Sequence, residues 1–221
     1  MTPERREKID RVLARRQPDL TVLAENLHKP RNFSALVRTC DSVGIGRIHA
    51  VRGEAALRRH WHTSQGAEKW VEVRAWASVT EAAEHLKARG FALVAAHLSD
   101  RAVDYREVVY TRPTALMLGT EAFGITDEAA RLADREIVIP MMGMSQSLNV
   151  SVACAVVLYE AQRQRAAAGL YDARRLDDAT WARLRFEAMH PSLARYCRER
   201  GLAYPALDER GNVVGEVPRG A

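Results

Sequence analysis

Three short apolar runs constrain the fold of this chain more than any other feature. They read FALVAA (residues 91–96), TALML (114–118) and IVI (137–139). None of them shows the alternation of polar and apolar residues that is typical of a strand with one face in water, so each is expected to be buried on both faces. Strands of this kind occur in parallel sheets that helices cover on both sides.

Further strand-like and helix-like segments alternate with these runs. The strand-like segments cover residues 19–26, 47–51 and 69–76, and the helix-like segments cover 31–44, 78–90, 126–133 and 149–169. This order predicts an α/β fold with a mainly parallel six-stranded sheet and helices on both faces. In such sheets ligands bind at the carboxyl ends of the strands.

The two ends of the chain lie outside this pattern. Thr2-Pro3-Glu4 is a typical helix start, and the helix is expected to end before Pro18. It is either a solvated amphipathic helix or a helix that lies against a phosphate backbone, in which case its candidate contacts are Arg5, Arg6, Arg11, Arg15 and Arg16. One or two helices and then a loose polar tail at 208–221 are expected to follow Gly169. The expected divisions are therefore residues 1–18, 19–169 and 170–221.

The charge of the chain leaves two explanations open. Lys and Arg number 33 against 28 Asp and Glu, which gives a net charge of +5 and a pI near 9.4, and Arg supplies most of the positive charge. The planar fork of Arg suits phosphate, so a polyanionic partner is one explanation. An Arg-rich surface without such a partner is the other.

The cysteines and the hydropathy of the chain predict its cellular compartment. Cys40, Cys154 and Cys197 form no CxxC pair, so neither a zinc ribbon nor a disulfide framework is indicated, and Cys40 and Cys154 are expected to be small core residues. The first twenty residues contain no apolar signal region, and no apolar run approaches the ~18 residues of a membrane span. We expect a cytoplasmic protein without a membrane segment.

Two glycine pairs look like nucleotide-binding loops but have the wrong context. Gly44 and Gly46 follow a helix and precede a strand, which is the reverse of the dinucleotide fingerprint. Gly119 and Gly124 have the spacing of a phosphate loop but lack the Lys that follows its second glycine. The motifs HExxH and GxSxG and the paired carboxylates of hydrolases are absent from the sequence too, and we expect no metal site.

Polar residues follow three of the expected strands. They are Asn32 and Arg38 after the first strand, Glu121 after TALML, and Ser145, Gln146, Ser147 and Asn149 after IVI. Ordinary structural roles exist for them: a helix cap, a surface ion pair, or an acid at a helix N-terminus. A cap explains one polar residue of the last group but not all four, so a binding loop is the alternative.

The three loops together resemble the SPOUT class of RNA methyltransferases, in its ribose 2′-O-methylating SpoU/TrmH family. The family motif N-x-x-[SA]-x-x-R is matched by residues 32–38, and L-x-x-G-x-E-x-x-G-[IV] by LMLGTEAFGI. The third motif is matched by IPMMGMSQSLNVSVA. The resemblance covers most of residues 5–175.

The resemblance implies a fold, a methyl donor and partners that the residues alone do not show. The third loop would belong to a deep C-terminal trefoil knot that cradles S-adenosyl-L-methionine. The chain would form a homodimer through helices near 30–43 and 149–166. Its substrate would be tRNA, methylated on the ribose of guanosine 18 in the D-loop. The alternatives are a ribosomal RNA methyltransferase of the same fold and a non-catalytic RNA-binding protein.

The resemblance also assigns roles to individual residues. Arg38 would be the central catalytic residue, and because Arg stays protonated in proteins we expect it to hold a phosphate and stabilise the developing alkoxide rather than act as a simple base. Asn32 would place Arg38 or help product release. The ribose pocket would be shaped by Glu121, Ser147 and Asn149. The methyl donor would be contacted by the backbone of Ala96, Gly119, Ile139 and Leu148. Relatives often carry Thr where this chain has Ala96, and Arg31 adds a charge beside Asn32.

Overall fold

The computed structural model describes residues 1–27, 29–51, 69–120 and 123–215. The chain groups into two compact units. The larger unit is residues 17–170, and the smaller unit combines residues 1–16 with residues from 171 onward. In the described part of the chain, no helix is both long enough and apolar enough to span a membrane.

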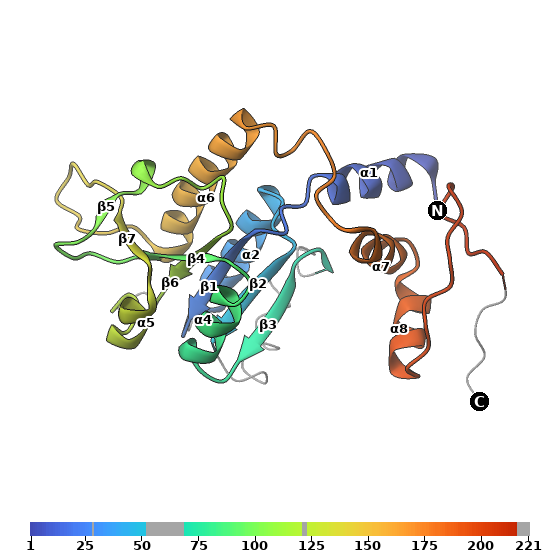
Figure 1. The fold of residues 1–221 in the computed structure, drawn as a ribbon, viewed down its shortest axis with the longest axis horizontal. Helices are drawn as coiled ribbons and strands as arrows, with labels where there is room; N and C mark the ends of the chain where they lie inside the picture. Colours follow the sequence, from blue (N-terminus) through green and yellow to red (C-terminus); the bar gives the residue numbers. More distant parts are fainter. Residues whose placement is uncertain (28, 52–68, 121–122, 216–221) are drawn as a thin grey trace. The chain divides into compact units, whose positions relative to one another are not determined.

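The larger unit is built on a parallel sheet with the strand order β3-β2-β1-β6-β4-β7-β5 (Figure 1). Its strands are β1 (Leu20–Glu25), β2 (Arg47–Val51), β3 (Glu72–Trp76), β4 (Ala92–Ala96), β5 (Val103–Asp104), β6 (Thr114–Leu118) and β7 (Arg135–Val138). The parallel α/β prediction is confirmed, but the predicted number of six strands is wrong. The additional strand β5 has two residues and pairs with β7 at the sheet edge, and two residues are too few to show any periodicity.

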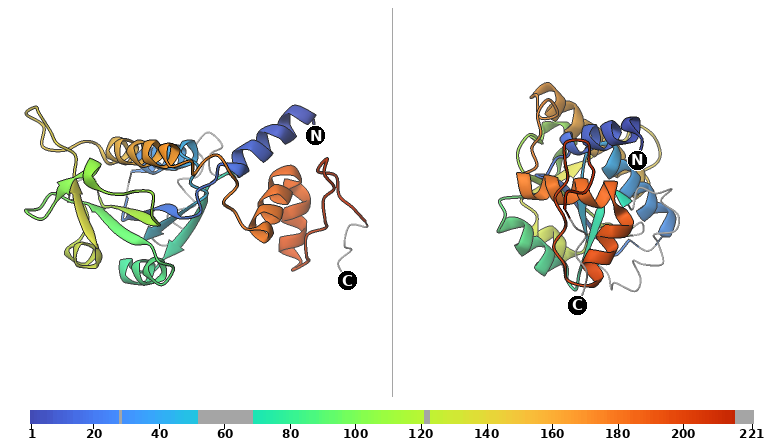
Figure 2. Two further views of the ribbon diagram at one scale, coloured as in Figure 1. Left: turned by 45° about the horizontal axis from the view of Figure 1, so that its top comes forward. Right: turned by 90° about the vertical axis from the view of Figure 1, so that its right-hand side faces the viewer.

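Helices cover both faces of this sheet (Figure 2). One face carries α2 (Pro30–Ser42) and α6 (Val150–Ala167), and the other carries α4 (Val79–Lys87) and α5 (Asp127–Leu132). A short 3-10 helix, Tyr105–Glu107, follows β5. Cys40 of α2 and Cys154 of α6 are fully buried in the first of these two layers, as predicted.

A buried arginine joins the two ends of the larger unit. Arg165 lies near the end of α6 and has no exposed surface. Its guanidinium donates five hydrogen bonds, to the carbonyl oxygens of Tyr110, Asp19 and Arg112 and to the side chains of Gln17 and Asp19. All five of its N–H groups therefore have an acceptor, which is the condition for burying this charge.

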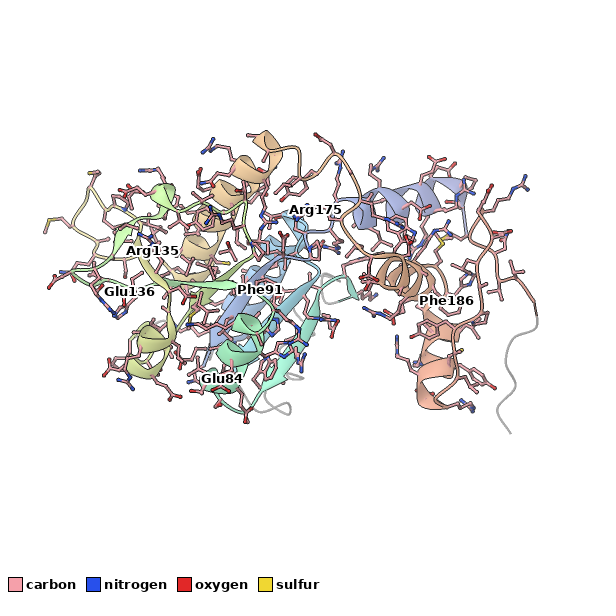
Figure 3. The ribbon with its side chains drawn as sticks, in the orientation of Figure 1. Glu84, Phe91, Arg135, Glu136, Arg175 and Phe186 are labelled. Carbon is pink, nitrogen blue, oxygen red and sulfur yellow. The ribbon has the colours of Figure 1, made fainter. Side chains whose placement is uncertain are left out.

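The described residues of the smaller unit form three helices, α1 (Pro3–Ala14), α7 (Asp178–Met189) and α8 (Pro191–Glu199). Thr2 caps α1. This helix packs against α7, and its residues Ile9 and Leu13 are buried. Arg185 of α7 holds both carboxylate oxygens of Asp10, at 2.8 and 3.3 Å. Phe186, labelled in Figure 3, is buried beside Tyr204 with the two rings stacked 4.6 Å apart.

The predicted loose tail is wrong for the residues up to 215. Leu207 and Val213 form an antiparallel bridge, and Arg185 donates to the carbonyl oxygens of Asp208 and Glu209. His190 lies 2.7 Å from the carbonyl oxygen of Gly211. Side chains of the preceding helices thus supply the partners that a polar, glycine-containing segment cannot supply alone. Residues 216–221 lie outside the described part.

Candidate active site

A cavity of about 560 Å³ lies at the carboxyl ends of three neighbouring parallel strands, β4, β6 and β7. Its walls are the segments that follow these strands, together with the loop 141–149 and the first turn of α6. The lining residues with predicted roles are Ala96, Gly119, Ile139, Ser147, Leu148 and Asn149. The parallel sheet brings these segments together because every strand ends at the same edge.

The second loop is shaped by close backbone contact. The backbones of Thr120 and Gly124 exchange two hydrogen bonds, of 2.7 and 3.0 Å. A Cβ atom on Gly119 would lie 1.9 Å from the carbonyl oxygen of Gly124, so no larger residue fits at position 119. Gly124 has a φ of +70°, which favours glycine. Backbone packing at the first position and backbone conformation at the second therefore favour glycine at both positions of the motif. The spacing of the two glycines in the sequence does not show this.

A buried carboxylate fixes the far end of this loop. Glu25, at the end of β1, accepts hydrogen bonds from the backbone N–H of Thr126 at 2.9 Å and from its hydroxyl at 2.8 Å. Thr126 is the N-cap of α5, so the loop is held between strand β6 and the cap of this helix. Glu25 was not among the predicted site residues, since a Glu at the end of an apolar strand resembles an ordinary polar boundary.

The wall after β4 is held by an ionic network. The carboxylate of Glu136, labelled in Figure 3, is buried and accepts hydrogen bonds from the hydroxyl of Ser99 and the guanidinium of Arg101. The hydrogen bond from Ser99, assisted by the charge of Arg101, lowers the pKa of Glu136. This network ties the segment that begins with the cavity residues His97 and Leu98 to strand β7.

Asn149 connects the first and third loops. Its Oδ1 accepts from the backbone N–H of Ser151 at 2.9 Å, so it caps α6. Its Nδ2 donates to Oδ1 of Asn32 at 3.2 Å. Asn32 is buried in the first turn of α2. Asn149 therefore has the structural role of a cap and also joins two motif loops.

Of the other two residues with predicted catalytic roles, Arg38 alone lies in the described part of the chain. Arg38 lies in α2 with its side chain exposed and does not line the cavity. Among the residues that the structure describes it makes no ion pair. Glu121 lies outside the described residues. Lys29, which the sequence reading did not single out, does line the cavity as the N-cap residue of α2.

The arginines predicted to bind RNA differ in exposure. Arg5, Arg11 and Arg15 are exposed and Arg6 is half-buried, whereas Arg16 is only 2% exposed. A guanidinium that binds phosphate has to reach the surface, so the burial of Arg16 argues against this member of the predicted set, which stays a prediction. Within the described segments, no group of three or more His, Cys, Asp or Glu side chains could hold a metal ion.

Two protein-family models match the sequence of this chain. The model of the SpoU rRNA methylase family matches residues 19–159, and that of the SpoU rRNA methylase C-terminal family matches residues 163–216. The chain belongs to the SpoU methylase family. Its SpoU core coincides with most of the larger unit, and its C-terminal match lies mainly in the smaller one.

Individual SpoU proteins are similar over nearly the whole chain. The tRNA (guanosine(18)-2'-O)-methyltransferase of Escherichia coli K12 is 48% identical over 98% of this chain and 96% of its own length. The protein of the same name from Thermus thermophilus is 55% identical over 80% of this chain and 91% of its own. The crystal structure of the A. aeolicus TrmH/SpoU tRNA modifying enzyme superimposes with a TM-score of 0.78 at 40% identity, covering 84% of this chain and 94% of that one.

Gly119→Ala is expected to lower kcat/KM for methyl transfer by about 10²-fold, because the loop has to move by an ångström or more to admit the methyl group. The added Cβ would meet backbone atoms of Gly124 and Ile125, which cannot rotate away. Gly143→Ala is the matched control, since nothing lies within 4 Å of a Cβ there. Steady-state kinetics of both variants checks the prediction, and equal loss in the two would contradict it.

Proposed function

We propose that this chain transfers a methyl group from S-adenosyl-L-methionine to the ribose 2′-hydroxyl of guanosine 18 in the D-loop of tRNA. The observation that carries the proposal is the similarity to tRNA (guanosine(18)-2'-O)-methyltransferases over 98% of the chain. Asn32, Arg38, Glu121, Ser147 and Asn149 are all present in the three motifs. This is the residue set expected of a catalyst rather than of a binding protein that has lost its chemistry.

The cavity suits S-adenosyl-L-methionine in size and lining. Its volume of about 560 Å³ lies within the range of small-molecule sites. Leu118, Ile137 and Leu148 offer apolar surface for an adenine ring, and the strand-end backbone offers polar groups. A related SpoU methyltransferase, AviRb from Streptomyces viridochromogenes, has been solved in complex with AdoMet and superimposes with a TM-score of 0.62 at 27% identity, covering 72% of this chain and 62% of that chain. In the proposed complex the backbone of Ala96, Gly119, Ile139 and Leu148 holds the methyl donor.

The protein's own part in the reaction is mainly orientation. The bound donor supplies a methyl group on a sulfonium, which is already activated for transfer to a hydroxyl. Holding the ribose in line with that methyl can contribute several kcal/mol. The guanidinium of Arg38 holds a phosphate beside the target ribose and stabilises the alkoxide as it develops, since Arg itself stays protonated. Asn32, fixed by Asn149, orients the start of the helix that carries Arg38.

The site is completed in a homodimer. Val152 and Tyr159 of α6 are exposed at 47% and 53%, two turns apart on a helix that packs beside α2. Arg38 is exposed on α2 and does not line the cavity of its own chain. A second copy that covers α2 and α6 would bury this apolar surface and bring Arg38 to a shared pocket.

Tyr159→Asp is therefore expected to shift the protein from dimer toward monomer and to lower methyl transfer in parallel. A carboxylate in such an interface would lose its water without gaining a partner. Sedimentation equilibrium measures the state of assembly. Glu107→Gln, on the 3-10 helix, is the control, and a Tyr159→Asp dimer of undiminished affinity would contradict the proposed interface.

The same proposal includes a trefoil knot and a separate function for each of three parts of the chain. The SpoU family match and a strand order that places β4 between β6 and β7 support a deep trefoil knot formed around β7 and α6. Residues 1–18 serve as an RNA-binding helix, 19–169 as the catalytic domain and 170–221 as a helical extension. The smaller unit holds 15 Lys and Arg against 11 Asp and Glu, so it carries a net charge of +4 of the chain's +5. We place the enzyme in the cytoplasm with its tRNA.

Replacing Arg5, Arg11 and Arg15 together with Gln is expected to weaken tRNA binding by about tenfold or more near physiological salt, because each lost phosphate contact removes a released counterion. The slope of log affinity against log salt should fall by about two to three. Binding of S-adenosyl-L-methionine should not change. Equal slopes for the variant and the wild-type protein would contradict the role of α1.

Transfer of labelled methyl from S-adenosyl-L-methionine separates the candidate functions. Unmodified tRNA, a ribosomal RNA fragment and a tRNA with 2′-deoxyguanosine at position 18 are offered in parallel. The proposal expects label in the first RNA alone. Label in ribosomal RNA alone would favour a ribosomal RNA methyltransferase, and no label with tight RNA binding would favour a non-catalytic RNA-binding protein.

A further inference from the structure

A group of cationic and aromatic side chains lies between β3 and α4, away from the cavity. We name it the β3–α4 cluster, and its members are His49, Arg74, Trp76, His85 and Arg89. His49 is 4% exposed, Arg74, Trp76 and His85 are half-buried, and Arg89 is exposed. The cluster thus has a buried base and an accessible cationic rim. None of its members lines the proposed methyl-donor site.

The imidazole of His85 lies between two guanidinium groups. Nη1 of Arg74 is 3.0 Å from its Nε2, and Nη1 of Arg89 is 2.9 Å from its Nδ1. A neutral imidazole has one acceptor nitrogen and one N–H, while a guanidinium can only donate. Whichever tautomer His85 adopts, one of the two contacts sets a donor against a donor. The cluster therefore holds more hydrogen-bond donors than acceptors.

Aromatic contacts hold the base of the cluster in place. The guanidinium carbon of Arg74 lies 4.2 Å from the centroid of the Trp76 ring. The indole N–H of Trp76 donates to Nδ1 of His49 at 2.9 Å, and the two rings stack. These contacts orient Arg74 before any ligand binds, which reduces the entropy lost on binding.

The positive charge of the cluster lacks a counter-charge among the described residues. The neighbouring Arg47 pairs with Glu72 at 2.9 Å, and Lys87 of α4 pairs with Asp134 at 2.9 Å. Arg74 and Arg89 have no carboxylate within ion-pair distance in the described part of the chain. Burial and then the charges of Arg74, Arg89 and Arg47 lower the pKa of His85, which agrees with a surplus of cations at this surface.

We propose that the β3–α4 cluster binds a phosphate group of the RNA backbone at its accessible rim, through the guanidinium groups of Arg74 and Arg89. Within the cluster Arg89 donates to the carbonyl oxygen of His85 at 3.1 Å, and a phosphate supplies acceptor oxygens for the remaining N–H groups and suits the planar donor fork of Arg. The identity of the RNA rests on the proposed function. In the sheet, β3 is three strands from β6, or about 15 Å at the usual strand spacing of ~4.8 Å, a distance that a folded RNA spans. The contact adds affinity and register and reads no sequence.

The first test is binding of unmodified tRNA to Arg74→Gln/Arg89→Gln, with Lys87→Gln as the matched control. The control removes a cation at the end of α4, two residues before Arg89, that already has a carboxylate partner. Loss of the cluster is expected to weaken tRNA binding about fivefold to tenfold and to lower the salt slope by one to two, whereas the control changes affinity less than about twofold. Unchanged affinity for S-adenosyl-L-methionine shows that the variants are folded.

The second test uses the wild-type chain and follows the imidazole signals of His85 by NMR, assigned with His85→Gln. Saturating tRNA is expected to raise the pKa of His85, because a bound phosphate offsets the neighbouring cations. Inorganic phosphate at equal ionic strength is the second arm. Signals that do not move with tRNA, or that move with inorganic phosphate alone, would overturn the assignment to RNA. Methyl transfer by the wild-type chain tests the proposed function separately, so the two can fail independently.

Discussion

Arg38→Ala is expected to lower the rate of methyl transfer to tRNA by about 10³-fold, the loss typical of removing a donor that stabilises developing negative charge. The side chain is exposed on α2 and does not line the methyl-donor cavity. Affinity for S-adenosyl-L-methionine should therefore stay within about twofold of wild type. Single-turnover kinetics with labelled donor, together with calorimetric titration of the donor, separates the two effects.

Conservative replacement of the same residue tests its geometry. Arg38→Lys keeps the charge but loses the bidentate fork, so we expect a loss of at least about tenfold in rate. Arg131→Ala is the control, because it removes an exposed arginine from α5. Near-wild-type turnover by Arg38→Lys would rule out a bidentate role, and full activity of Arg38→Ala would remove Arg38 from the catalytic set.

Arg165→Met is expected to lower the free energy of unfolding of the larger unit by about 3–5 kcal/mol, because it removes the fully buried guanidinium that pairs with the carboxylate of Asp19 and donates to three carbonyl groups. The guanidinium of Arg165 makes five hydrogen bonds that join α6 to the start of β1 and to the segment 110–112. At roughly 2–4 °C per kcal/mol, the melting temperature should fall by about 10 °C.

The chain offers a matched control two residues away. Arg163 also lies on α6, but its side chain is 67% exposed and it pairs with Glu160 at 2.7 Å. Arg163→Met is expected to change stability by less than about 1 kcal/mol. Urea unfolding of the two variants gives the comparison. Similar destabilisation by both would show that burial of Arg165 is not what holds these segments together.

The difference in burial between these two arginines could not be predicted from the sequence. Both occur in the stretch QRQRAAAG, where neither spacing nor residue type distinguishes the exposed Arg163 from the buried Arg165. The difference arises from segments distant in sequence, since the acceptors come from Gln17, Asp19, Tyr110 and Arg112. A local sequence pattern does not show which hydrogen-bond acceptors the fold places beside an arginine.

The strands and the cavity were predictable for a physical reason. Strands buried on both faces have to be continuously apolar, so β4, β6 and β7 stood out in the sequence. A parallel sheet then requires their following loops to meet at one edge, which is where the cavity lies. Strand β5 could not be predicted because two residues carry no pattern, and the ordered segment up to 215 could not because Arg185 and His190 stabilise it from a distance.

The roles within the site were only partly accessible from the sequence. The motifs named Asn32 and Asn149, and the structure joins them by a hydrogen bond. They did not name Glu25, whose function as an acceptor for Thr126 depends on residues a hundred positions apart. Exposure of Arg38 on α2 could not be read from its motif either, because the motif does not say which side of the helix packs on the sheet.

The most direct test of the central claim is to map the methylated nucleotide in a single unmodified tRNA treated with this protein and S-adenosyl-L-methionine. Ribose methylation blocks alkaline cleavage at one position, and mass spectrometry of the digest identifies the nucleoside. We predict one product, 2′-O-methylguanosine at position 18, formed by the wild-type protein and not by Arg38→Ala. A methyl group on a base, at another nucleotide, or on no nucleotide at all would contradict the account.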